Sequence, residues 1–224
     1  MRTISIISQK GGAGKTTLAL HLAVYAQSVG RRTAVFDTDP QASAYQWSTW
    51  RDNPEPPVID CGSPHLLPRK LEQSAKDGFE LAIIDTPPHA DIMAREAAKV
   101  ADLILIPCKP QAFDIASAQT SAELARSSHK QAFVILMGGP QRAANIYSDV
   151  ADVIRGTDEI EGMGVELAPV MLTHRAAYHH STAQGATVNE FEPQGKAAEE
   201  VASLWKWLVT VIDLPVAGTE GKDR

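Results

Sequence analysis

A glycine-rich stretch between a strand-like run and a helix-like run constrains the fold of this chain more than any other feature. Residues 8–17 read SQKGGAGKTT, directly after the β-branched run TISIIS and directly before the run LALHLAVYAQSVG. The first run predicts a buried strand, and the second, which ends at Gly30, predicts a helix. A strand, a glycine-rich loop and a helix in this order predict a loop that binds phosphate groups.

Apolar strand-like runs and helical runs alternate along the rest of the chain. Strands are predicted at 3–8, 32–37, 79–85, 102–107, 132–138 and 165–172, and helices at 16–30, 42–52, 66–78, 91–101, 111–128, 142–156 and 195–212. This alternation predicts a doubly wound α/β fold, with a mostly parallel sheet covered by helices on both faces. Ligands of such folds lie at the carboxyl ends of the strands. We expect one domain over residues 1–212 and a flexible tail over 213–224.

Composition narrows the class of protein. The chain has 224 residues and a formal net charge of −6, which disfavours a wholly basic nucleic-acid wrapper but allows a local basic patch. Cys61 and Cys108 are far apart and form no CxxC pair, so we interpret them as reduced, packed thiols of a cytoplasmic protein. The N-terminal run is too short and too β-branched for a signal peptide, and no apolar run has the length of a membrane span.

Each residue type in the loop suits one part of a nucleotide. Glycines let backbone N–H groups turn toward phosphate oxygens, and the N-terminus of the following helix adds its positive end. Lys15 is expected to reach the β- and γ-phosphates, and the Thr16 hydroxyl is expected to bind Mg²⁺. The predicted nucleotide-binding residues are Gly11, Gly12, Ala13, Gly14, Lys15, Thr16 and Thr17. The alternative is a glycine-rich turn that binds no ligand.

The segment KGGAGKTT resembles the deviant Walker A motif of the ParA/MinD superfamily of ATPases, a group of P-loop NTPases. The position of the first motif glycine is taken by Gln9, and the resemblance continues to about residue 208. It implies ATP and Mg²⁺ as cofactors and a homodimer that encloses ATP between its subunits. It also implies that Lys15 serves the ATP of its own subunit, while Lys10 crosses the interface to the ATP of the partner.

Carboxylates follow two of the predicted strands. Asp85 ends the run FELAIID and resembles the Walker B carboxylate, so we expect it to hold Mg²⁺. Asp37 and Asp39 match the D-x-D pattern of the superfamily. By this match Asp39 is catalytic, because it positions the attacking water, and Asp37 supports the magnesium shell. The alternative for each aspartate is a helix cap or a turn residue.

Two further segments resemble the partition branch of the superfamily, and specifically the short plasmid type of ParA. They are DPQAS at 39–43 and the C-terminal portion at 173–208. The resemblance implies a slow ATPase, stimulated by a ParB-like partner, whose ATP dimer binds DNA non-specifically on the nucleoid and segregates plasmid or chromosomal cargo. The segment LMGGPQR at 136–142 lacks the Asn with which relatives often read adenine.

Non-specific DNA binding needs a row of cations on one face. The candidates are Arg175, in the segment THRAAY, together with Arg142 and Lys196. The alternative for each is an ordinary solvated surface charge. His174, His179 and His180 lie beside Arg175, and we interpret them as surface histidines that bind no metal.

Other functions stay open. The same switch positions other cargo in this superfamily, namely a chemoreceptor cluster, a microcompartment or a conjugation complex. A metabolic P-loop enzyme is a third possibility. Stable membrane association is not expected, because the run VASLWKWLVTVIDLP carries a single lysine, and its apolar residues Trp205, Leu208 and Val209 suit a packed core.

Overall fold

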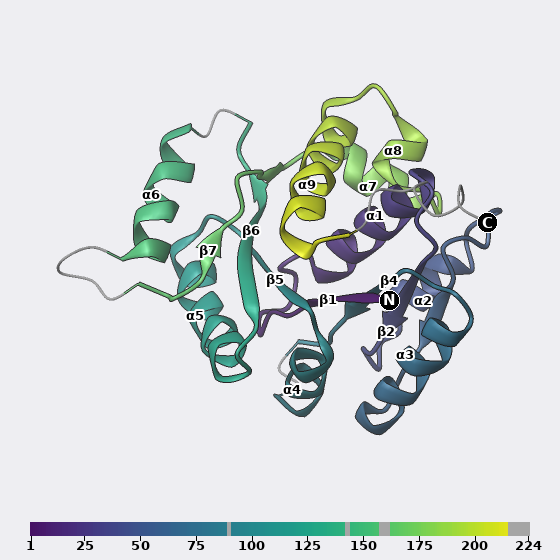
Figure 1. The fold of residues 1–224 in the computed structure, drawn as a ribbon. Helices are drawn as coiled ribbons and strands as arrows, with labels where there is room; N and C mark the ends of the chain where they lie inside the picture. Colours follow the sequence, from purple (N-terminus) through teal and green to yellow (C-terminus); the bar gives the residue numbers. More distant parts are fainter. Residues whose placement is uncertain (89–90, 142–143, 157–161, 215–224) are drawn as a thin grey trace, which may run out of the picture.

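A parallel sheet runs through the molecule (Figure 1), and β1, the strand that leads into the glycine-rich loop, lies in the middle of its strand order. The structure is a computed structural model, and it describes residues 1–88, 91–141, 144–156 and 162–214. Its strands are β1 (Arg2–Ile6), β2 (Thr33–Asp37), β3 (Val58–Asp60), β4 (Leu81–Asp85), β5 (Leu103–Cys108), β6 (Gln131–Gly139), β7 (Glu166–Leu167) and β8 (Leu172–Thr173). The strand order is β3-β2-β4-β1-β5-β6-β7, and β8 pairs with β6. Every pairing is parallel, which confirms the predicted fold class.

Helices cover both faces of this sheet. They are α1 (Lys15–Ser28), α2 (Ser43–Ser48), α3 (Leu67–Lys76), α4 (Asp91–Val100), α5 (Ala112–Ser127), α6 (Ala144–Arg155), α7 (Ala176–Ala183), α8 (Val188–Phe191) and α9 (Lys196–Ile212). In Figure 1, α1, α7, α8 and α9 gather on one side of the strands, and α3, α4 and α5 lie on the other side.

Alternation of side chains along the strands creates two separate cores. In β4, Leu81 and Ile83 point to the core shared with α1 and α9, while Ala82 and Ile84 point to the core shared with α3, α4 and α5. Successive residues of a strand face opposite sides of the sheet, and here both sides are covered. For this reason the strands read in the sequence as continuous apolar runs.

The end of the sheet differs from the predicted strand at 165–172. Two short strands, β7 and β8, replace it, and both pair with β6. Pro169 lies between them. A proline has no N–H group to donate to a neighbouring strand, so the ladder is interrupted there. The register between β6 and β8 also shifts between Met137 and Gly139.

Three small elements were not among the predicted ones. They are β3, which adds an edge strand beside β2, and the helices α7 and α8, which join β8 to α9. These elements have between three and eight residues and too few apolar residues for a periodic pattern. α8 has a capping box, in which the Thr187 and Glu190 side chains bind each other's backbone N–H groups.

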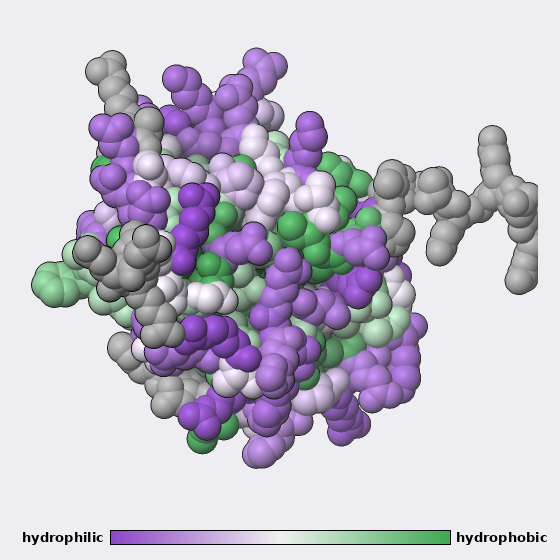
Figure 2. All heavy atoms as spheres, turned by 60° about the vertical axis from the view of Figure 1, so that its left-hand side comes forward, coloured by the Kyte–Doolittle hydropathy of each residue, from purple (hydrophilic) through white to green (hydrophobic). Residues whose placement is uncertain are grey.

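The last long helix packs as the sequence indicates. Trp205 and Leu208 are buried in the core with α1, and Val209 packs against that core. Among the described residues, no helix has the length and hydropathy needed to cross a membrane. Residues 215–224, which form most of the predicted tail, lie outside the described part of the chain. Figure 2 shows hydrophilic side chains over most of the face that lies to the left in Figure 1, with hydrophobic side chains in small separate areas.

Candidate nucleotide and magnesium site

The predicted site residues meet where three neighbouring strands end. The sheet register places Ile6 of β1 and Asp37 of β2 on either side of Asp85 of β4. The glycine-rich loop follows β1 directly and leads into α1. The strand order therefore brings the loop and the two aspartate-bearing strand ends together, as expected for ligand sites in doubly wound sheets.

The loop backbone requires glycine at two positions. Gly12 and Gly14 have φ angles of 71° and 100°, in the left-handed region that other residues rarely adopt. Gly14 is also the N-cap of α1, so the free N–H groups of the first helical turn face the loop. A Cβ atom at Gly14 would lie 3.0 Å from the Met137 side chain. This geometry is that of an anion-binding helix N-terminus.

The Lys15 ammonium is held inside this loop. Its Nζ atom donates hydrogen bonds to the carbonyl oxygens of Ser8, at 3.0 Å, and Lys10, at 3.2 Å. Burial lowers the pKa of Lys15, while the Asp85 and Asp39 carboxylates raise it in part. A phosphate group at the loop would give this cation the anionic partner that the backbone oxygens only approximate.

Asp85 is a buried carboxylate without hydrogen-bond partners. It is 1% exposed, and within the described residues neither of its side-chain oxygens has a hydrogen bond of normal geometry. Burial is the main cause that raises its pKa to about 7; the Thr16 hydroxyl and Lys15 ammonium act in the opposite direction. An unpaired carboxylate in such a place is costly unless a cation completes the site.

This arrangement fits a magnesium ion. The Asp85 carboxylate and the Thr16 hydroxyl are oxygen ligands, which Mg²⁺ prefers. Among the described residues, no three His, Cys, Asp or Glu side chains converge as a complete metal cage. An ion held by Asp85 and Thr16 would therefore take its other ligands from nucleotide phosphates and water, as Mg²⁺ does in many phosphate-transfer sites. When bound, it would neutralise charge on the phosphates.

Asp37 and Asp39 have different surroundings. Asp37 is 1% exposed, and its carboxylate accepts hydrogen bonds from the backbone N–H groups of Asp39, at 3.1 Å, and Tyr45, at 2.9 Å. It thus ties the loop after β2 to the start of α2, the capping role that the sequence left open for it. Asp39 is half-buried and accepts a bond from the Gln41 N–H group at 2.9 Å. The charge of its carboxylate raises the pKa of both Lys15 and Asp85, so Asp39 lies near these two groups.

Lys10 is paired within its own chain. Its Nζ atom contacts the carboxylate of Asp114 in the first turn of α5. The Lys10 side chain is 40% exposed, whereas that of Asp114 is 4% exposed. The two lysines of the loop thus differ, because Lys15 points into the site and Lys10 lies at its open edge.

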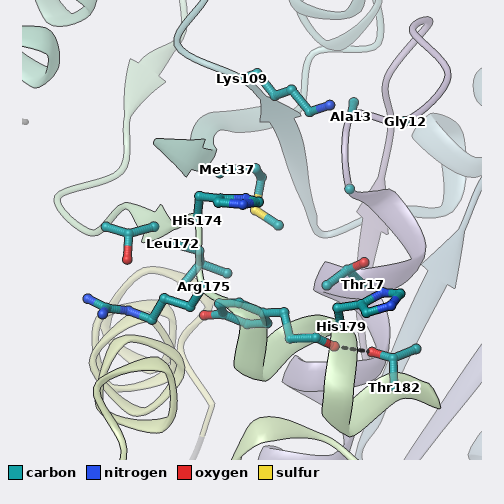
Figure 3. Close-up of a pocket in the computed structure, with 14 residues that line it drawn as sticks. Gly12, Ala13, Thr17, Lys109, Met137, Leu172, His174, Arg175, His179 and Thr182 are labelled. Atoms are coloured by element: carbon teal, nitrogen blue, oxygen red, sulfur yellow. Dashed lines mark hydrogen bonds between the residues drawn. The ribbon is translucent and has the colours of Figure 1, made fainter. Parts of the chain in front are cut away.

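A pocket of about 320 Å³ extends from the glycine-rich loop toward α7 (Figure 3). On the loop side Figure 3 shows Gly12, Ala13 and Thr17, and on the opposite side it shows Leu172, His174 and Arg175. The remaining lining residues are Gly14, Lys109, Met137, Gly138, Thr173, Tyr178, His179 and Thr182. Because this space is continuous with the phosphate-binding loop, it has room for the nucleoside end of a nucleotide.

Residues 4–203 match the CobQ/CobB/MinD/ParA nucleotide-binding domain. The chain belongs to this family. The glycine-rich loop and the aspartates after β2 and β4 all lie within the matched range.

Known members resemble the chain over most of its length. It is 26% identical, over 90% of its residues and 94% of the relative, to Maintenance of carboxysome distribution protein A from Halothiobacillus neapolitanus. It is 28% identical to Protein ParA from Rhizobium radiobacter, over 80% of this chain and 81% of the relative. The cell division ATPase MinD from Pyrococcus furiosus has the same fold, with a TM-score of 0.76 and 20% identity over 94% of this chain and 99% of MinD. The CobQ/CobB/MinD/ParA family includes ATPases, and members have been solved with ATP and with Mg-ADP.

Two of the three DNA-binding candidates lie in the described part of the chain, and their surroundings differ. Arg175 is paired with Glu200, with 2.7 Å between the guanidinium and the carboxylate. Lys196 is exposed at the start of α9. Arg142 lies outside the described residues. The DNA-binding role of all three stays a prediction.

Sequence reasoning missed two carboxylates that the structure places beside the site. Asp114 lies in the segment PCKPQAFDIASA and pairs with Lys10. Glu200 lies in KAAEEV and holds Arg175. A single sequence does not show which cation each carboxylate meets, because the partners lie 104 and 25 residues away.

Proposed function

We propose that this protein is a positioning ATPase that binds ATP and Mg²⁺, forms a homodimer around ATP and binds DNA non-specifically in that state. The observation that carries the proposal is the Asp85 carboxylate, which ends β4 beside the glycine-rich loop and is buried without a well-aligned hydrogen bond among the described residues. A site of this kind needs both a cation and a polyphosphate. Membership of the CobQ/CobB/MinD/ParA family supports ATP as that polyphosphate.

Each residue of the site has one role in hydrolysis. The loop N–H groups and Lys15 hold the phosphates, and Thr16 and Asp85 hold the metal. Asp39 orients the water that attacks the γ-phosphate, and Asp37 holds the loop that carries Asp39 in place. The reaction converts ATP and water to ADP and phosphate. Turnover is slow until an activator protein completes the site.

Lys10 makes dimer formation depend on bound ATP. Its side chain is at the open edge of the loop and is 40% exposed, so it is free to extend toward a second subunit once it leaves Asp114. A γ-phosphate buried between two subunits carries charge that water no longer screens, and an ammonium from the partner stabilises it strongly. Loss of that phosphate on hydrolysis removes the attraction and loosens the dimer.

The cargo is a plasmid or chromosomal partition complex, recognised through a ParB-like activator while the ATP dimer is on the nucleoid in the cytoplasm. The likeness to Protein ParA of R. radiobacter supports this cargo. A microcompartment is the second candidate, because the H. neapolitanus relative is named for carboxysome distribution and matches over 94% of its own length. Genes next to the coding sequence distinguish the two, since a small DNA-binding protein encoded directly downstream favours partition.

A gel-shift series tests the proposal. Wild-type protein and Lys10→Ala are titrated onto DNA of unrelated sequences with ATP and Mg²⁺, with ADP and Mg²⁺, and without nucleotide, at a stated salt concentration. The expected result is a shift with ATP only, for wild-type protein only and for every DNA sequence. A wild-type protein that binds DNA equally well without ATP, or not at all, contradicts the proposal and favours a metabolic P-loop enzyme.

A further inference from the structure

One carboxylate holds most of the outer wall of the pocket beside the phosphate loop. Glu200 of α9 accepts hydrogen bonds from the Thr173 N–H group at 3.0 Å and the Thr173 hydroxyl at 2.7 Å. It also accepts bonds from Nε and Nη2 of Arg175, at 3.0 and 2.7 Å, and from the Tyr178 hydroxyl at 3.5 Å. Thr173, Arg175 and Tyr178 all line the pocket.

The wall also has other attachments, and those of β8 are short. β8 has only two residues, and its ladder with β6 contains a register shift. The backbone bond from His174 N–H to the Gly139 carbonyl, at 2.7 Å, is its next contact along the chain. Tyr178 connects the wall to α1, because its ring packs against His21 with 5.1 Å between ring centroids. Removal of Glu200 would leave the Thr173 N–H group, the Thr173 hydroxyl and the Arg175 guanidinium without this acceptor, whereas the Tyr178 hydroxyl keeps the Ala197 carbonyl oxygen at 3.4 Å.

Glu200 also forms an ion pair with Arg175. Its side chain is 15% exposed, and that of Arg175 is 17% exposed, so their ion pair is partly shielded from water. The pair keeps the guanidinium along α9 rather than in the pocket, as Figure 3 shows for Arg175, which points away from Thr17 and Ala13.

We propose that Glu200 is a positioning residue, which fixes the wall that packs against the nucleoside of a bound nucleotide and so sets the affinity for that part of the ligand. Glu200 does not line the pocket itself and acts through Thr173, Arg175 and Tyr178. The inference rests on the proposed function, because it takes the phosphate loop as the site of the nucleotide's phosphates. A diphosphate without a nucleoside contacts the loop but not this wall. Its affinity should therefore not depend on Glu200.

The test compares two ligands that differ only by the nucleoside. Affinity for ADP is measured directly, and affinity for pyrophosphate by competition, both with Mg²⁺ and with wild-type, Glu200→Ala and Glu200→Gln proteins. ADP avoids the γ-phosphate, so dimer formation does not enter the result. Glu200→Ala is expected to weaken ADP about tenfold, in line with the loss of partners for buried polar groups, and to change pyrophosphate affinity less than about twofold. Glu200→Gln keeps an acceptor for Thr173 but loses the ion pair with Arg175. Its affinity for ADP should lie between that of the wild type and that of Glu200→Ala.

Glu199→Ala is the matched control, because Glu199 precedes Glu200 on the same helix and is exposed. It is expected to bind both ligands as the wild type does. Equal loss of both ligands in the Glu200 variants, or no loss of either, overturns the positioning role. If Glu200→Ala does not fold, Glu200→Gln decides alone by the same comparison. A wild-type protein that binds neither ligand contradicts the proposed function itself, which separates that failure from failure of this inference.

Discussion

Lys10 of the glycine-rich loop pairs with Asp114 of α5, whereas Lys15 of the same loop bonds to backbone oxygens of the loop itself. The Asp114 side chain is almost fully buried, so Lys10 is its counter-ion in the single chain. In the proposed ATP dimer, Lys10 has to leave this contact to reach the other subunit. Under that proposal, the energy of the Lys10–Asp114 pair is part of the balance between monomer and dimer.

Replacement of Lys10 should therefore also affect the folded monomer. Lys10→Ala leaves a buried carboxylate without its cation and is expected to lower the free energy of unfolding of nucleotide-free protein by about 1 kcal/mol, since the exposed lysine is partly screened. Urea unfolding measures this loss. In the double variant Lys10→Ala, Asp114→Asn the cost should be smaller than in Lys10→Ala. Equal costs would show that the pair does not stabilise the monomer.

Replacement of Asp85 should raise the stability of the protein instead of lowering it. Its carboxylate is buried, and among the described residues neither oxygen has a well-aligned hydrogen bond. Asp85→Asn removes a carboxylate whose charge is disfavoured by burial. At pH 8 it is expected to raise the stability of nucleotide-free protein by at least about 1 kcal/mol, or roughly 3 °C in melting temperature. The same variant should lose the further rise that Mg-ADP gives the wild type. Thermal unfolding with and without Mg-ADP measures both effects. A variant that is less stable alone, and is still stabilised by Mg-ADP, contradicts the metal role.

Asp39 should matter for hydrolysis and not for binding. Asp39→Ala is expected to bind ATP and to form the dimer, but to hydrolyse ATP at least about 100-fold more slowly, since a positioned base or water-orienting group contributes that much. Phosphate release with and without an activator measures the rate. Asp37→Ala is the informative comparison, because Asp37 holds the loop and its loss should lower stability as well. Hydrolysis at the parental rate in Asp39→Ala would remove its assigned role.

His21 gives the fold a pH dependence. It is 1% exposed in α1, its Nδ1 atom lies 2.7 Å from the Thr17 carbonyl oxygen, and Nε2 has no partner in the described residues. Burial lowers the pKa of His21 to about 4. Below pH 6.5 the unfolded chain gains a proton at His21 that the folded chain does not, so stability falls as the pH drops from about 6.5 toward 4.

Over this pH range, His21 is expected to lower the free energy of unfolding by about 3 kcal/mol. Urea unfolding of wild-type and His21→Gln protein between pH 4 and 7 isolates the contribution of His21. The variant should lose this part of the dependence of the free energy of unfolding on pH. The same dependence of stability on pH in both proteins would show that the pKa of His21 does not change on folding.

The sequence was sufficient where each signal is local. The loop from Gly11 to Thr16 needs only neighbouring residues, and the buried strands β4 and β5 are continuous apolar runs, so the strand–loop–helix order and the parallel fold class were predicted correctly. Long-range pairs were not accessible. Asp114 and Glu200 meet Lys10 and Arg175 only after the chain has folded, and no local pattern indicates which charge a buried carboxylate will meet. The split of the last strand at Pro169 was readable, because proline ends a ladder, but the apolar run around it suggested a continuous strand.

The most direct test of the account is the mass of the protein with ATP and Mg²⁺, measured by light scattering for wild type, Lys10→Ala and Lys15→Ala. The account predicts a dimer for wild type. It predicts a monomer that still binds ATP for Lys10→Ala, and a monomer that binds no nucleotide for Lys15→Ala. A Lys10→Ala protein that dimerises with ATP as the wild type does would contradict the role of Lys10 across the subunit interface.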